Sequence, residues 1–224
     1  MAQPDASSAG EPADLLERAG RGDPAALGEL FGRYRERLRR MVKLRMDRRM
    51  QGRLDASDVL QEAYVEMAGS LADYLRDPAM PFFLWLRTLT GRKLHALHRQ
   101  HLGTHMRDAS REVSLYHGPF PQASSVSLAA HLLGRLTSPS QAAVKAELRI
   151  RVQEALNGMD ALDREVLALR HFEQMNNVEI ARVLGISETA ASNRFVRALK
   201  RLKAILMEVP GYLDPPPPDA PRPR

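Results

Sequence analysis

The chain has 224 residues, 33 Lys and Arg against 27 Asp and Glu, a formal net charge of +6 and no cysteine. The length permits one ordinary domain or two small ones, and the lack of cysteine excludes a disulfide framework and any zinc or iron–sulfur site built on cysteine. The longest wholly apolar run, residues 82–86, is far shorter than the ~20 residues of a membrane-spanning helix, and residues 1–20 lack a secretory signal, so we expect a cytoplasmic protein without membrane insertion.

The N-terminal half carries the periodicity of three helices. Residues 1–22 are poor in apolar groups, so we expect a disordered N-terminus. Asp23 followed by Pro24 is a typical helix start, and apolar residues recur at helical spacing from there to residue 42. A second helix is expected over about 57–74, and a third from Phe82 onward, after a proline-rich break. Trp85 falls on an apolar position of the third helix, which favours the core, with a stacking platform for a base as the alternative.

The helical pattern is interrupted once and then returns. Between residues 103 and 140 the composition shifts to Gly, Ser and Pro, which is typical of a linker, although residues 128–133 could form a short helix. The tail contains four consecutive prolines, which exclude a helix there. The sequence therefore predicts an all-α protein with these parts: a disordered N-terminus at 1–22, a helical domain at 23–103, a flexible linker at 104–140, a second helical domain at 141–207 and a Pro-rich tail at 208–224.

The clearest local pattern predicts a helix-turn-helix. Asn176 followed by Glu179 resembles a capping box, Gly185 stands where the turn requires a positive φ, and Ser187 can cap the second helix. An ordinary helical hairpin with a basic face is the alternative. The positions expected to face inward on the second helix are Ala191, Phe195, Ala198, Leu199, Leu202 and Leu206.

A helix-turn-helix places its second helix in the major groove of DNA, with the N-terminal end of that helix nearest the bases. Polar and basic residues of this helix are therefore the candidates for contacts with bases and phosphates. They are Thr189, Ser192, Asn193, Arg194 and Arg197, with Lys200, Arg201 and Lys203 expected to contact the DNA backbone.

Charge is distributed in blocks along the N-terminal half. Residues 33–53 hold ten Lys or Arg and two acids, residues 54–77 hold six acids and one Arg, and residues 78–107 hold no acid. This alternation indicates two kinds of partner surface, although solvated helix faces give the same pattern.

The chain carries no pattern typical of catalysis or metal binding. Four histidines lie close together, but no cysteine or carboxylate supports them as metal ligands. Three carboxylates could form an acid–base or metal site, but no further ligand or base lies near them in the sequence. These residues are His95, His98, His101 and His105 in the first group, and Asp55, Asp58 and Glu62 in the second. We expect no enzyme, no metal and no cofactor.

Short motifs in the two halves occur in the order of a known family. They are DVLQEA at 58–63 and WLRTL at 85–89, then LDREVLALR at 162–170 and EIARVLGIS at 179–187. The first pair resembles the region-two signature, and the second pair the region-four signature, of small two-domain bacterial RNA polymerase sigma factors of the extracytoplasmic-function class. The resemblance covers about residues 23–207, and residues 94–103 and 111–115 look like variants found in planctomycete-type members.

The resemblance implies three interaction surfaces. Asp58, Gln61 and Glu62 share one helix face, which in the family docks on the β′ clamp helices of core RNA polymerase. The acid-free helix from Phe82 onward implies contact with the −10 promoter element, where the loop at about 75–81 shapes a pocket for an extruded base. Its phosphate contacts would be made by Arg87, Arg92, Lys93 and Arg99. The residues implied at the −35 element are Thr189, Ser192, Asn193, Arg194, Arg197, Lys200 and Arg201.

The expected function is that of a transcription initiation factor, which binds core polymerase, reads the −35 element and helps to melt the −10 element. Core RNA polymerase and promoter DNA are the implied partners, and an anti-sigma or other regulatory protein is a further partner that the resemblance allows. The free chain is expected to be a monomer. Two alternatives stay open at this point: an autonomous helix-turn-helix regulator that binds an operator as a dimer, and a general RNA- or single-strand-binding protein.

Overall fold

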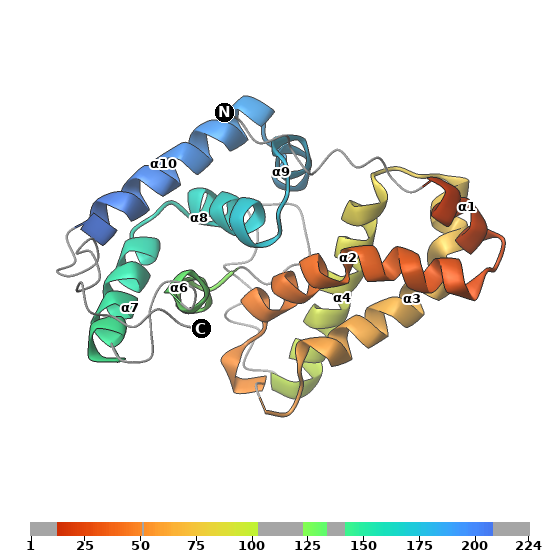
Figure 1. Ribbon diagram of the computed structural model, residues 1–224, viewed down its shortest axis with the longest axis horizontal. Coiled ribbons are helices and arrows are strands. Elements are labelled where there is room, and N and C mark those ends of the chain that lie inside the picture. The colour runs from red at the N-terminus through yellow and green to blue at the C-terminus, as the bar shows by residue number, and fades with distance from the viewer. Residues whose placement is uncertain (1–12, 51, 103–122, 134–141, 208–224) are drawn as a thin grey trace, which may run out of the picture.

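The computed structural model describes residues 13–50, 52–102, 123–133 and 142–207, and the regular elements in these ranges are helical (Figure 1). The prediction of an all-α protein is therefore confirmed. In chain order the elements are α1 (Ala13–Gly20), α2 (Pro24–Arg45), the short η1 (Arg48–Met50), α3 (Ala56–Arg76), α4 (Phe82–Leu102), α6 (Ser125–Leu133), α7 (Ala142–Asn157), α8 (Ala161–Leu167), the π-helical turn η5 (Ala168–Phe172), α9 (Asn177–Leu184) and α10 (Glu188–Met207).

Local capping signals fix the starts of the N-terminal helices. The side chain of Asp23 accepts hydrogen bonds from Ala25 N and Ala26 N at 2.9 and 3.2 Å, and Pro24 occupies the first helical position of α2. Asp55 and Asp58 form a capping box at the start of α3. The three long helices α2, α3 and α4 thus begin close to the predicted positions, and they pack together into one bundle.

Helix α1 differs from the expectation of a disordered segment over residues 1–22. Leu15, Leu16 and Ala19 are buried, and α1 packs on α2 and α3. A Cβ atom on Gly20 would lie 2.4 Å from Leu75 Cδ1, so the end of α1 fits closely against the end of α3. Helix α1 has only two turns, so its sequence pattern is weak. Burial of its apolar face supplies the stabilisation that its intrinsic helix propensity does not.

Aromatic side chains fill the centre of the N-terminal bundle. Phe82 is fully buried, and its ring centroid lies 5.7 Å from that of Tyr34 and 5.6 Å from that of Tyr74. Trp85 stacks on Tyr74 at 4.5 Å with an interplanar angle of 26°. The Tyr74 hydroxyl donates to Met80 O at 2.9 Å, which ties the aromatic cluster to the loop before α4. Trp85 is therefore engaged in the core, as its helical spacing predicts.

The C-terminal half surrounds a second apolar cluster. Leu128 and Leu133 of α6 pack with Leu156 of α7 and Leu202 of α10, and Leu44 of α2 joins them. Helix α6 lies within the stretch predicted to be a linker. The remainder of that stretch, at 103–122 and 134–141, and the Pro-rich tail at 208–224 lie outside the described residues, so the domain boundaries stay a prediction.

The two halves are packed against each other, with α6–α10 on the left and α1–α4 on the right in Figure 1. One apolar cluster spans the boundary: it contains Leu38 and Leu86 of the N-terminal half together with Val166, Ile180 and Leu184 of the C-terminal half. The boundary also holds several Arg–Glu contacts, which are described below.

Candidate nucleic-acid and protein interfaces

The helix-turn-helix has the predicted local geometry. Asn176 Oδ1 accepts from Glu179 N at 2.8 Å, and Glu179 Oε2 accepts from Asn176 N at 2.9 Å, which completes the capping box of α9. Gly185 has φ of 66°, so the turn uses the left-handed conformation that glycine adopts without a steric penalty. Ser187 Oγ accepts from Ala190 N at 3.1 Å at the start of α10.

The cap of α9 leads to a testable prediction. Asn176→Ala removes the acceptor for Glu179 N, and we expect a loss of about 1 kcal/mol in the free energy of unfolding. Urea unfolding followed by circular dichroism measures this change. Asn176→Asp retains an acceptor oxygen and serves as the control, for which the midpoint should stay close to that of the native chain. A midpoint for Asn176→Ala that equals the native value would contradict the prediction.

The second helix of the motif, α10, presents most of its candidate contacts to solvent. Thr189, Asn193, Arg197, Lys200 and Arg201 are exposed, whereas Ser192 and Arg194 are half-buried.

The inward face of α10 is narrower than expected. Ala191, Ala198 and Leu202 are buried as predicted, and Phe195 is half-buried. Leu199 is 40% exposed, so its assignment to the core is wrong. Helix α10 packs on α7, α8 and α9, and Leu199 lies outside the packed face together with the exposed Val196. The side chain of Leu206 lies outside the described residues.

Two acids that the sequence does not single out hold the basic side chains of α10. Arg194 Nη1 lies 2.5 Å from Asp163 Oδ1 and 3.2 Å from Asp160 Oδ1. Arg197 Nη2 lies 3.3 Å from Asp163 Oδ1. Asp160 is also the N-cap of α8, so the start of that helix and the orientation of Arg194 are linked. The partners are 31 to 34 residues apart, and no sequence pattern relates them.

The acidic residues of α3 lie on an open surface. Asp58, Gln61 and Glu62 are all exposed. Asp58 Oδ2 also accepts from Asp55 N at 2.7 Å, so this carboxylate serves the helix cap as well. Val65, one turn beyond Gln61 and Glu62, is 64% exposed and extends the same face with an apolar side chain. We call Asp58, Gln61, Glu62 and Val65 the α3 face.

The basic residues of α4 divide into two groups. Arg92 and Arg99, seven residues apart, are exposed on one side of the helix, and Lys93 Nζ lies 2.9 Å from Glu66 Oε2. Arg87 is 2% exposed and faces the C-terminal half. The structure therefore exposes Arg92 and Arg99, leaves Lys93 half-buried in its ion pair, and does not place Arg87 with them.

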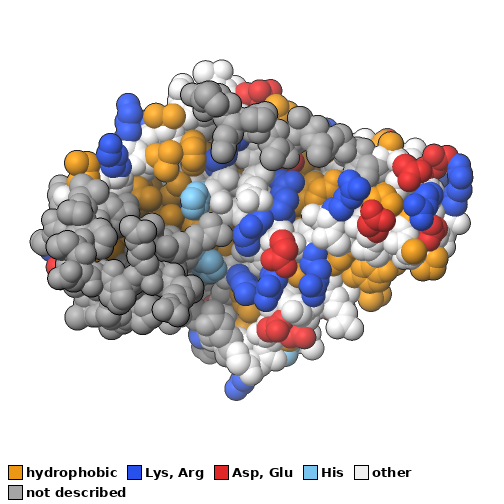
Figure 2. All heavy atoms as spheres, in the orientation of Figure 1, with side chains coloured by type: hydrophobic (Ala, Val, Ile, Leu, Met, Phe, Trp, Pro, Cys, Tyr) orange, Lys and Arg blue, Asp and Glu red, His pale blue; other side chains and the backbone are white. Residues whose placement is uncertain are grey.

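The basic side chains of residues 33–53 also lie in two different environments. Arg33, Arg35 and Lys43 are exposed on α2, and Figure 2 shows Lys and Arg side chains over the middle of the molecule, where α2 runs, with acidic side chains among them. Arg37 and Arg45, by contrast, turn toward the C-terminal half. The basic block of the sequence thus contributes side chains both to a solvated face and to an internal contact.

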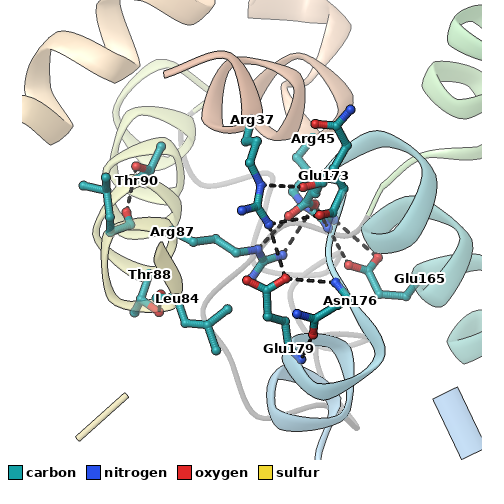
Figure 3. Close-up of polar contacts among 12 residues, drawn as sticks. Arg37, Arg45, Leu84, Arg87, Thr88, Thr90, Glu165, Glu173, Asn176 and Glu179 are labelled. Atoms are coloured by element: carbon teal, nitrogen blue, oxygen red, sulfur yellow. Dashed lines mark hydrogen bonds and ion pairs between the residues drawn. The ribbon is translucent and has the colours of Figure 1, made fainter. Parts of the chain in front are cut away.

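The internal contact is a cluster of buried charged side chains between the halves (Figure 3). Glu173 Oε2 lies 2.6 Å from Arg87 Nε, and Glu173 Oε1 lies 2.5 Å from Arg45 Nη2. Arg45 Nη2 also lies 2.5 Å from Glu165 Oε1. Arg45, Arg87 and Glu173 are at most 3% exposed. We call Arg45, Arg87, Glu165 and Glu173 the boundary cluster; it joins α2 and α4 to α8 and the segment after η5.

The charges of the boundary cluster balance one another. Burial by itself raises the pKa of Glu173, but the Arg45 and Arg87 guanidinium groups outweigh burial and hold its pKa below the ordinary value. Burial lowers the pKa of Arg45, and Glu165 and Glu173 reverse this effect and raise it. Glu173 and Arg45 therefore carry their charges at neutral pH. The sequence gives no sign of the cluster, because the Arg and Glu residues that pair in it are 86 to 128 residues apart.

Further hydrogen bonds cross the same boundary. Arg37 Nε donates to Glu173 O at 3.0 Å, and Arg37 Nη2 lies 3.3 Å from Glu179 Oε2. Arg182 of α9 donates to Ala79 O at 2.7 Å, which attaches the helix-turn-helix to the loop before α4.

No group of three or more His, Cys, Asp or Glu that could hold a metal ion occurs within the described residues. His98 is buried, its Nε2 accepts from Asp47 N at 3.3 Å, and burial lowers its pKa. His105 lies outside the described residues.

None of the described helices has both the length and the apolar content of a membrane-spanning helix.

Comparisons with known proteins identify relatives of this chain. Residues 149–202 match the family model for sigma-70, region 4. RNA polymerase sigma factor CnrH of Cupriavidus metallidurans is 30% identical over 195 residues, which cover 86% of this chain and 92% of that protein. ECF RNA polymerase sigma factor SigD of Mycobacterium tuberculosis is 27% identical over 198 residues, covering 88% and 85%. A solved structure of CnrH in complex with the cytosolic domain of CnrY shares 25% identity, covers 87% of this chain and 96% of that one, and has a TM-score of 0.49. The identity and coverage shared with CnrH show that this chain belongs to the extracytoplasmic-function RNA polymerase sigma factors.

Proposed function

We propose that this sigma factor binds core RNA polymerase through the α3 face, reads the −35 element with α10, and helps to open the −10 element with α4 and the loop at 75–81. The observation that carries the proposal is the presence, in one chain, of an exposed basic helix in a helix-turn-helix and an exposed acidic face on a separate helix bundle. Core polymerase and promoter DNA are the two partners that these surfaces fit.

Each surface has a chemical role. The β′ clamp helices offer basic groups in the family resemblance, and the carboxylates of Asp58 and Glu62 complement them. Arg92, Lys93 and Arg99 neutralise phosphates whatever the base sequence. The factor contributes binding and promoter opening and no catalytic residue of its own. An anti-sigma or other regulatory protein stays a prediction of the family resemblance.

Substitution of two residues of α10 tests the −35 assignment. With Arg194→Ala and Arg197→Ala together, we expect run-off transcription by reconstituted polymerase to fall about tenfold or more at −35-dependent promoters, because a good side-chain contact to a base contributes ~1–3 kcal/mol. Arg151→Ala, which removes a half-buried Arg of α7, is the matched control and should leave transcription unchanged.

The pattern across promoters separates the outcomes of that experiment. A loss that varies with the −35 sequence indicates contacts to bases, and an equal loss at every promoter indicates contacts to phosphates only. Tight binding of the free chain to a palindromic duplex without polymerase would instead support an autonomous regulator and contradict the proposed function.

A further inference from the structure

The side chains of α10 that are candidates for DNA contact lie along two lines on the helix. The exposed line contains Thr189, Asn193 and Val196, which recur at i, i+4 and i+7. Arg194 and Arg197 lie three residues apart on a neighbouring side of the helix, and both contact the start of α8. The two arginines therefore flank the exposed line.

A single carboxylate oxygen of α8 holds both arginines. Asp163 Oδ1 lies 2.5 Å from Arg194 Nη1 and 3.3 Å from Arg197 Nη2. Like charges three residues apart on a helix repel each other, and Asp163 supplies the negative charge between these two guanidinium groups. Its side chain is 15% exposed, so mobile ions screen the contact less than they screen a pair on the open surface. One residue outside the helix-turn-helix thus sets the orientation of two residues within it.

The carboxylate of Asp163 lies on a well-anchored helix end. It belongs to the first turn of α8, where the helix dipole stabilises a negative charge. Asp160 caps this helix by accepting from Leu162 N at 2.9 Å, and Leu162 is itself buried. Arg164 Nη1 donates to Leu156 O at 3.1 Å, which ties α8 to α7. Asp163 is therefore held in place by the protein before any DNA arrives.

The contacts with Asp163 leave part of each guanidinium group for DNA. A guanidinium carries five N–H donors on three nitrogen atoms. Among the described residues, the ion pairs engage only Nη1 of Arg194 and only Nη2 of Arg197. A side chain that is already fixed loses less rotamer freedom on binding, and it contacts best the DNA sequence that matches its fixed position. Fixed arginines therefore favour one sequence over the others.

The negative charge of Asp163 has an effect in the same direction. Basic side chains attract phosphates whatever the base sequence, and this attraction supplies most of the non-specific affinity for DNA. A carboxylate beside the arginines opposes that attraction. On a matched sequence the base contacts offset this cost, and on an unmatched sequence nothing does, so the carboxylate disfavours the wrong sequences more.

We infer that Asp163 is a positioning residue for promoter recognition: it holds Arg194 and Arg197 in fixed orientations and so raises the preference of the factor for its own −35 sequence over other DNA. The inference rests on the proposed function, which assigns α10 to the −35 element. Asp163 acts through the two arginines and needs no contact of its own with a base.

Binding of two duplexes by the holoenzyme, the complex of core polymerase with this factor, tests the role of Asp163. The first probe is a fluorescent duplex that the native holoenzyme selects from fragments of random sequence, and the second is the same duplex with its −35 block scrambled. Asp163→Asn keeps the shape of the side chain and removes its charge. We expect the ratio of the two affinities to fall about fivefold or more, because affinity for the selected duplex decreases and affinity for the scrambled duplex does not.

A second pair of variants shows whether the effect passes through the arginines. In the Arg194→Ala/Arg197→Ala background, adding Asp163→Asn should leave the ratio unchanged, because the side chains that Asp163 holds are absent. A fall of the same size in this background would show that Asp163 acts in another way, and would overturn the inference. Glu147→Gln removes an exposed negative charge of α7 and is the matched control, which should keep the native ratio.

The ratio also separates a loss of recognition from a loss of folding. A misfolded fraction lowers both affinities of one preparation together and leaves their ratio unchanged. If Asp163→Asn loses helix content by circular dichroism, Asp163→Glu takes its place, since it keeps the charge and displaces the carboxylate by one methylene group, and the ratio should again fall.

Two results would count against the inference in distinguishable ways. A native ratio in the folded Asp163 variants, while the native holoenzyme discriminates between the duplexes, overturns the positioning role and leaves the −35 assignment in place. Equal binding of both duplexes by the native holoenzyme contradicts the −35 assignment itself, and with it the role of Asp163.

Discussion

Gln61→Lys together with Glu62→Lys should weaken binding of the factor to core RNA polymerase by about a hundredfold or more. Both side chains are exposed on α3 and contribute nothing to the core of the bundle. On the docking surface proposed above, two positive charges opposite basic clamp helices would cost several kcal/mol, because they replace attraction with like-charge repulsion. Fluorescence anisotropy of a labelled chain titrated with core polymerase measures the change in Kd.

The controls for this experiment follow from the capping geometry. Asp58 is left unchanged in the charge-reversal variant, because its carboxylate also caps α3, and Asp58→Asn tests it separately while retaining an acceptor oxygen. Asp73→Lys reverses an exposed charge elsewhere on the same helix and should preserve binding. Native affinity in the Gln61→Lys/Glu62→Lys chain would contradict the assignment of the α3 face.

Phe82→Ala should destabilise the N-terminal bundle by ~3–5 kcal/mol. The side chain is fully buried and contacts the rings of Tyr34, Tyr74 and Trp85, so its removal leaves a cavity between three helices. The loss should appear as a lower urea midpoint without a change in slope. Val65→Ala, at an exposed position of α3, should change the unfolding free energy by less than ~0.5 kcal/mol. A midpoint for Phe82→Ala within the range of Val65→Ala would show that Phe82 does not hold the bundle together.

Much of the fold could be predicted because its signals are local. The start at Asp23-Pro24, the capping box of Asn176 and Glu179, and the turn at Gly185 each lie within a few residues, and the structure confirms all three. Helix α1 could not be predicted with the same means, because its stability comes from burial of Leu15 and Leu16 against helices that follow it in the chain.

The candidate surfaces were predictable only in part. The sequence groups Arg87 with Arg92 and Arg99 as phosphate contacts, and in the structure only Arg92 and Arg99 of these three are exposed. Helical spacing puts Arg87 on another side of α4, but it does not reveal the partner there, because Glu173 lies 86 residues away in the chain. Likewise, Asp163 is found beside Arg194 only once α8 and α10 are packed together. Pairings between distant segments are set by tertiary packing rather than by helical periodicity.

Burial of the boundary cluster has a consequence for the response of the factor to ionic strength. Mobile ions screen exposed charges over about 8–10 Å of solvent, and they screen charges held within the protein much less. Added salt should therefore weaken the phosphate contacts proposed for Arg92 and Arg99, while the Arg45–Glu173–Arg87 contact keeps most of its strength. The association of the two halves should therefore depend less on ionic strength than the proposed binding of promoter DNA does.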